Sequence, residues 1–117
     1  MRLYHVGLPW YIDVRATHQN GVTVYDVMTQ MYRELMKGIT PRHWWNEEVG
    51  EELRGAVTEA YAKRVREAEK RGDRSERGRG VVWLDWLGDR VVFEGLVRGR
   101  NGMWEVRTGR FEVAGFE

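Results

Sequence analysis

A change of hydrophobic period near residue 81 constrains the fold of this chain more than any other feature. From there onward apolar and polar residues alternate, which indicates half-buried strands. Two dipeptides interrupt the alternation, Gly88-Asp89 and Asn101-Gly102, and both are typical of two-residue hairpin loops. The sequence therefore predicts an antiparallel meander with strands over residues 81–87, 90–100 and 103–107.

Two-residue loops fix the register of the meander, so the residues on each face can be identified. One face is free of charge and consists of Val82, Leu84, Trp86, Val91, Phe93, Gly95, Val97, Trp104 and Val106. The other mixes Trp83, Leu87, Val92 and Leu96 with the charged residues Asp85, Arg90, Glu94, Arg98, Glu105 and Arg107. We expect helices to cover the charge-free face, and the mixed face to form a homodimer. In the alternative, a monomer, Trp83 is covered by residues 3–6 or by Phe111, Val113 and Phe116 of the tail.

Residues 23–71 have the apolar spacing of helices. Thr23 is suited to cap a helix that ends near Gly38, and Thr40-Pro41 is a typical start for the next helix. This second helix runs to about residue 71, either continuously or with a break near Gly50.

Two further segments complete the predicted fold. Residues 8–14 alternate in polarity and predict a strand that joins the sheet or packs at its rim. Residues 72–80 are charged and contain no large apolar side chain, so we expect a mobile loop that proteases cut first. The fold class is therefore α+β, with an antiparallel meander of three to five strands packed on one face by two main helices.

Length and composition limit the kind of protein. With 117 residues and a formal net charge of +1, the chain is expected to form a single domain over residues 1–117. It has no Cys, which excludes disulfides and thiolate metal sites. No stretch is long and apolar enough for a membrane span, and the first residues lack the pattern of a signal peptide. We therefore expect an intracellular, cytoplasmic protein without a membrane partner.

Five short motifs are spaced along residues 8–97. They are Pro9 with Asp13-Val14, Ile39-Thr40 with Trp44 or Trp45, Ala60 with Arg64, Leu84-Asp85 with Leu87, and Phe93 with Gly95-Leu96. Together they resemble a fungal domain family of unknown function, the DUF6699 family. The resemblance implies a fungal α+β domain, and it implies no activity, because none is established for the family.

Two sets of charged residues are candidates for chemistry. In the predicted register Asp85 and Glu94 lie diagonally across a hairpin, at roughly 5–8 Å, which suits acid/base catalysis. The same face also holds Arg90, Arg98 and Arg107, so a ladder of ion pairs is a better explanation of the two carboxylates than catalysis. Arg64 falls on the apolar stripe of its helix and needs a carboxylate partner, because an unpaired buried guanidinium costs several kcal/mol. Asp13 and Asp85 are both candidates for that partner, and the alternative is a site at Arg64 for an external anion.

Other constellations favour binding over catalysis. The three His lack ligand-like spacing, Ser75 has no base beside it, and no phosphate-binding loop is present, so we expect no metal and no cofactor. The basic residues of 63–79 are interleaved with acids and lack aromatics, so we expect no specific nucleic-acid partner. Trp44 and Trp45 are adjacent on a helix, so only one can point fully inward, and the other is free to contact a sugar or a protein.

These observations predict a non-enzymatic protein-interaction or scaffold module. The predicted contact residues are Trp83, Trp44, Trp45 and Arg64, and the partner is a second copy of the chain or another protein. The alternative is a small-ligand or carbohydrate-binding domain that uses an exposed tryptophan. A third hypothesis is an acid/base enzyme that uses Asp85 and Glu94.

Overall fold

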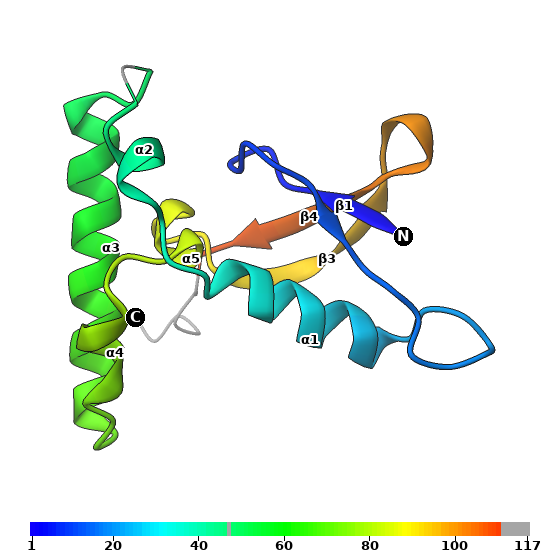
Figure 1. Ribbon diagram of the computed structural model, residues 1–117, viewed down its shortest axis with the longest axis horizontal. Coiled ribbons are helices and arrows are strands. Elements are labelled where there is room, and N and C mark those ends of the chain that lie inside the picture. Colours follow the sequence, from blue (N-terminus) through cyan, green and yellow to red (C-terminus); the bar gives the residue numbers. More distant parts are fainter. Residues whose placement is uncertain (47, 111–117) are drawn as a thin grey trace, which may run out of the picture. The chain divides into compact units, whose positions relative to one another are not determined.

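The computed structural model describes residues 1–46 and 48–110, which form two compact units (Figure 1). The first unit combines Met1–Glu34 with Asp89–Glu117, and the second is Leu35–Gly88. The single domain expected from the length stays a prediction. Among the helices of the described residues, none is both long and apolar enough to cross a membrane.

The first unit contains a mixed sheet of four strands in the order β2-β1-β4-β3. The strands are β1 (Arg2–Tyr4), β2 (Ile12–Asp13), β3 (Val92–Arg98) and β4 (Trp104–Gly109). β1 runs antiparallel to β2 but parallel to β4, and β3 and β4 form an antiparallel hairpin. The α+β class is confirmed, whereas the purely antiparallel meander is wrong because β1 inserts between β2 and β4.

The β3–β4 hairpin confirms the turn predicted at Asn101-Gly102 but shifts its register. Both residues have positive φ, 54° and 74°, and the amide of Met103 donates to the carbonyl of Arg100 over 2.9 Å. The amide of Gly99 also donates to the carbonyl of Met103, and this longer loop moves the register by one residue. The predicted charge-free face is therefore wrong, because Leu96 pairs with Val106 and Val97 pairs with Glu105.

The helix α1 (Val24–Leu35) of this unit begins where the sequence predicts. The Thr23 hydroxyl accepts from the amide of Asp26 over 3.1 Å, and the buried Asp26 carboxylate accepts from the Thr23 amide and the Thr17 hydroxyl. Of the strand expected over residues 8–14, only Ile12–Asp13 forms a strand, which is β2. The unit buries Leu3, Ile12, Val14, Val27, Met31 and Val106.

The second unit is helical. It consists of α2 (Pro41–Trp44), α3 (Glu51–Lys70), α4 (Ser75–Arg79) and α5 (Trp83–Trp86), with α4 and α5 both in contact with α3 (Figure 1). Of the two possibilities that the sequence left open, a continuous helix or a break near Gly50, the structure has the break, since Gly50 is the N-cap of α3. Only α1 shares a unit with the sheet, so the predicted arrangement of two helices on one sheet face is not matched. The buried apolar residues of this unit are Val57, Val65, Ala68, Val82, Trp83 and Leu87.

The helix α5 replaces the strand predicted over 81–87. In a short apolar run the strand and helix periods are hard to distinguish. The carboxylate of Asp85 accepts from the amide of Val82 over 2.9 Å, which stabilises the first turn of a helix. Gly88, with a φ of 65°, ends the helix and donates to the carbonyl of Asp85 over 3.0 Å, rather than forming a hairpin loop.

The segment 72–80 is also more structured than predicted. It contains α4, whose residue Arg77 pairs with Glu69 of α3 over 3.0 Å. The hydroxyl of Tyr61 donates to the carbonyl of Arg77 over 3.1 Å. The expectation of a loop throughout 72–80 is wrong, because residues 75–79 form a helix that contacts α3. The expectation that proteases cut this segment first stays a prediction.

Candidate functional site

An open hollow in the unit Leu35–Gly88 is the candidate binding site of the protein. It has a volume of about 310 Å³ and is lined by Gly38, Ile39, Pro41, Trp44, Trp45, Arg79, Gly80 and Val81. Backbone contacts join the two segments that form it. The amide of Ile39 donates to the carbonyl of Val81 over 3.0 Å, and Gly38 forms a β-bridge with Val82.

The helix α2 and the residue that follows it supply the two tryptophans of the hollow, since Trp44 ends α2 and Trp45 is its C-cap. Thr40 caps this helix, since its hydroxyl accepts from the amide of His43 over 3.4 Å, and Pro41 follows in the first turn. The rings of Trp44 and Trp45 meet edge to face with their centres 6.5 Å apart. Trp45 is 68% exposed and Trp44 is half-buried, which answers the question that the sequence leaves open.

One arginine lies over a tryptophan, and another lines the hollow. The guanidinium of Arg54 lies 5.1 Å from the ring centre of Trp45 and donates to two backbone carbonyls over 2.8 and 3.2 Å. Arg79 lines the hollow, and its Nε donates to Glu76 over 3.2 Å. A molecule in the hollow therefore meets apolar rings and positive charge together.

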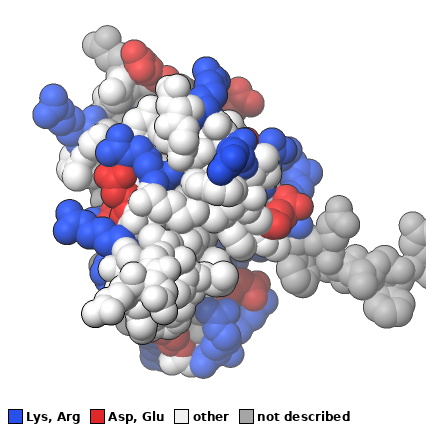
Figure 2. All heavy atoms as spheres, turned by 90° about the vertical axis from the view of Figure 1, so that its right-hand side faces the viewer, with Lys and Arg blue, Asp and Glu red and all other residues white. Residues whose placement is uncertain are grey.

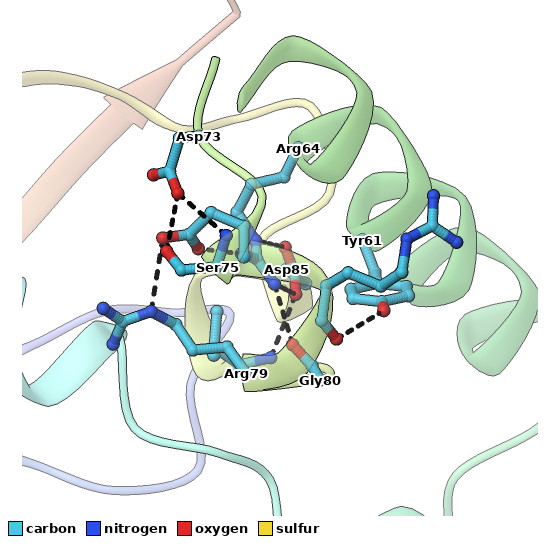
Figure 3. A network of polar contacts seen from close by, with 10 residues as sticks. Tyr61, Arg64, Asp73, Ser75, Arg79, Gly80 and Asp85 are labelled. Carbon is cyan, nitrogen blue, oxygen red and sulfur yellow. Dashed lines mark hydrogen bonds and ion pairs between the residues drawn. The ribbon is translucent and has the colours of Figure 1, made fainter. Parts of the chain in front are cut away.

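Arg64 connects α3, α4 and α5 next to the hollow (Figure 3). Its Nε and Nη2 donate to the two carboxylate oxygens of Asp85 over 2.9 and 3.1 Å, which is a bidentate ion pair. Nη2 also donates to the carbonyl of Gly80 over 2.8 Å, and Nη1 donates to the carboxylate of Glu76. Gly80 belongs both to this network and to the lining of the hollow.

The structure selects Asp85 as the partner of Arg64, since Asp13 pairs with Arg2 over 2.7 Å. The side chains of Arg64 and Asp85 are 14% and 2% exposed. Burial alone lowers the pKa of Arg64, but the hydrogen bond and the charge of Asp85 outweigh it and raise that pKa above its ordinary value. The protein's own carboxylates thus bind this guanidinium.

Trp83 differs most from its predicted position. It begins α5 and is buried, with its ring centre 5.4 Å from His43 and 5.3 Å from Trp86. The expectation that it lies exposed on the mixed face of a meander is wrong, because residues 83–86 form a helix. The residues expected to cover it from the tail, Phe111, Val113 and Phe116, lie outside the described residues.

The proposed acid/base pair, Asp85 and Glu94, is not joined by the predicted strand pairing. Asp85 lies in α5, where it accepts hydrogen bonds from Arg64 and Val82, and Glu94 lies exposed on β3. Within residues 1–46 and 48–110, no group of three or more His, Cys, Asp or Glu is arranged to hold a metal ion. The described residues thus supply an open hollow and a buried ion network.

Several of the basic residues of 63–79 form ion pairs within the second unit. Arg64 binds Asp85 and Glu76, Arg77 binds Glu69, and Arg79 binds Glu76. On the face shown in Figure 2, basic and acidic side chains are interspersed. The expectation of no specific nucleic-acid partner stays a prediction.

Glu76 and Arg79 are charged residues of the site that sequence patterns did not indicate. Their segment was expected to be a loop, yet it holds a local signal for a turn before a helix. The carboxylate of Asp73 accepts from the hydroxyl and the amide of Ser75 over 2.6 and 2.9 Å (Figure 3), which is the geometry that an Asp-x-Ser sequence favours. Asp73-x-Ser75 therefore marks the start of α4.

Comparisons with known proteins give one match. A search of curated proteins and a search of solved structures each found none. The fungal source and the cytoplasmic location expected from the sequence stay predictions. The model of a family of unknown function (DUF6699) matches residues 1–102, a range that includes the hollow and the Arg64 network, and the chain therefore belongs to the DUF6699 family.

Proposed function

We propose that the protein is a non-enzymatic interaction module that binds a short segment of another protein in the hollow beside Trp45. The observation that carries the proposal is the exposed ring of Trp45 on the wall of the hollow. Exposed aromatic and arginine side chains are enriched where proteins bind one another. The segment places an apolar side chain against the rings and a carboxylate at Arg79.

The lining of the hollow favours a peptide over a sugar. Its side chains are the two tryptophans with Ile39, Pro41 and Val81, and Arg79 is the charged member. A carbohydrate offers many hydroxyls, and these need several polar side chains to replace the hydrogen bonds that they make with water. An apolar side chain loses little by leaving water and gains contact with the rings.

The buried ion network argues against catalysis by Asp85. Its carboxylate accepts from two nitrogens of Arg64 and from the amide of Val82, and its side chain is almost fully buried. A general acid or base needs hydrogen-bond access to a substrate. In this proposal Asp85 holds the segment before α5 in place and does not contact the ligand.

A random peptide library displayed on phage tests the proposal. We expect selected peptides to share an apolar residue near an acidic one and to bind with micromolar affinity. Trp45→Ala should weaken them by about 30-fold, which is typical of a central interface aromatic. Tyr11→Ala is the matched control, since Tyr11 is an exposed aromatic in the other unit.

Two results would overturn this proposal. One is a library selection in which no peptide depends on Trp45. The other is a glycan array in which a sugar binds through Trp45 while peptides do not, which would favour the carbohydrate alternative.

A further inference from the structure

The wall of the hollow contains a backbone amide that the protein itself does not use. Gly38 and Val82 form an antiparallel β-bridge, beside which the amide of Ile39 donates to the carbonyl of Val81 over 3.0 Å. In a regular antiparallel ladder such a pair exchanges two hydrogen bonds, so the amide of Val81 would return to the carbonyl of Ile39. This second bond does not form, and in the described part of the chain the amide of Val81 has no hydrogen-bond partner.

The unpaired amide faces the hollow. Val81 is half-buried and lines the hollow opposite Ile39 and Pro41. In extended backbone the amide and the carbonyl of one residue point toward the same neighbouring segment, so the amide of Val81 faces the segment that its carbonyl contacts. A ligand that supplies an acceptor at this place satisfies a donor that the fold leaves open.

Arg79 adds charged donors to the same wall. Its Nε donates to Glu76 over 3.2 Å, and its two terminal nitrogens have no partner among the residues that the structure describes. Glu76 is also paired with Arg64, so an anion that reaches Arg79 does not meet an uncompensated negative charge. A guanidinium beside an open backbone amide is a donor set that suits a carboxylate, which has two oxygens to place.

We propose that the hollow binds the carboxyl-terminal residue of its partner protein, an inference that rests on the proposed function and specifies its ligand. One oxygen of the terminal carboxylate accepts from the amide of Val81, and the other accepts from Arg79. The last side chain of the partner is apolar and packs against Trp44 and Trp45. Capture of a terminal carboxylate by backbone amides is a recurrent way in which proteins bind peptides.

An internal segment of a protein fits these donors less well. Where the chain continues, an amide N–H replaces the second carboxylate oxygen, and this donor cannot accept from Arg79. The volume of the hollow, about 310 Å³, is also at the small end of the range for ligand sites, which is about 300–1,000 Å³. A chain end needs less room than a segment that enters on one side and leaves on the other.

Synthetic peptides with altered ends test the inference. Peptides selected from a library displayed with free carboxyl ends are made with a terminal carboxylate, with a terminal amide, or with one glycine added after the last residue. In calorimetry with the full chain, the amide and the added glycine should each weaken binding at least about 10-fold, as expected when hydrogen bonds to a charged group are lost. Acetylation of the amino end, the matched control, should leave the affinity unchanged.

Variants of the protein identify the donor. Arg79→Gln should weaken binding of the carboxylate form at least about 10-fold and change that of the amide form little, because only the carboxylate needs the guanidinium. Arg77→Gln is the control, since Arg77 is an exposed arginine of the same helix that pairs with Glu69 and does not line the hollow. Comparison of the two peptide forms on one variant separates the lost contact from any change in folding.

Failure of this inference and failure of the proposed function are different results. Peptides that depend on Trp45 but bind equally well as amides overturn the inference and leave the proposed function standing. An Arg79→Gln variant that weakens both forms equally also overturns it. A library in which no peptide depends on Trp45 overturns both.

Discussion

Removing Arg64 should destabilise the unit Leu35–Gly88 strongly. The variant Arg64→Met keeps the aliphatic part of the side chain and deletes the guanidinium, which donates to Asp85, Glu76 and Gly80. The buried carboxylate of Asp85 then loses its cation, and the carboxylate of Glu76 keeps only Arg79. Breaking a buried pair by removing one partner costs about 3–5 kcal/mol, and a domain of this size is stable by only about 5–15 kcal/mol.

A double-mutant cycle with Asp85→Leu separates the ion pair from other effects. Asp85→Leu alone leaves Arg64 with Glu76 and removes the acceptor for the amide of Val82, so about 3 kcal/mol or more should be lost. The double variant replaces the buried pair with two apolar side chains. It should be more stable than the sum of the two losses predicts, by at least about 1.5 kcal/mol.

Urea unfolding followed by tryptophan fluorescence and by far-ultraviolet circular dichroism measures each free energy of unfolding. Agreement of the two probes checks that a single free energy describes the transition. Two outcomes would refute this reasoning. One is a loss below about 1 kcal/mol for Arg64→Met, and the other is strict additivity of the two single variants.

Three further predictions concern other residues. The hydrogen bond from the Thr17 hydroxyl is the largest cause that lowers the pKa of Asp26 from 3.8 to about 2. The ionised Asp26 carboxylate therefore stabilises the folded protein fully above pH 3.8, and this stabilisation is lost as the pH falls toward 2. In acid titrations, the difference in stability between the wild type and Asp26→Asn should close over that range. Asn101 has a φ of 54°, so Asn101→Ala should cost about 1–2 kcal/mol while Asn101→Gly is tolerated; equal melting temperatures for the two variants would contradict this. Glu76→Gln should lower the free energy of unfolding by about 1–3 kcal/mol. It should also release Arg79 and so tighten the binding of acidic peptides. Calorimetry that shows weaker peptide binding would count against the role given to Arg79.

Helix starts could be predicted from the sequence because their determinants are local. Thr23 caps α1, Thr40-Pro41 starts α2, and Gly50 precedes α3. In each case the deciding residue lies within three or four positions of the amides that it serves. A short window of sequence holds all the information that such a boundary needs.

The segment 81–87 could not be predicted because its determinant is distant. Asp85 caps α5 and accepts from Arg64, which lies 21 residues earlier in the chain. Alternation of apolar residues favoured a strand, and this tertiary contact favours a helix. The hairpin register failed on a smaller scale, since the bond from Gly99 to Met103 adds a residue that the Asn101-Gly102 signal does not show.

The candidate site was predictable as separate parts but not as a whole. The sequence indicated that Arg64 needs a buried carboxylate and that only one of two adjacent tryptophans points inward, and the structure agrees with both. It did not indicate that these features meet. Gly80 accepts from Arg64 and lines the hollow, and Glu76 binds both Arg64 and Arg79. The ion pair therefore holds residues of the hollow in place, and we expect a change at Arg64 to weaken the binding of the proposed peptide without contacting it.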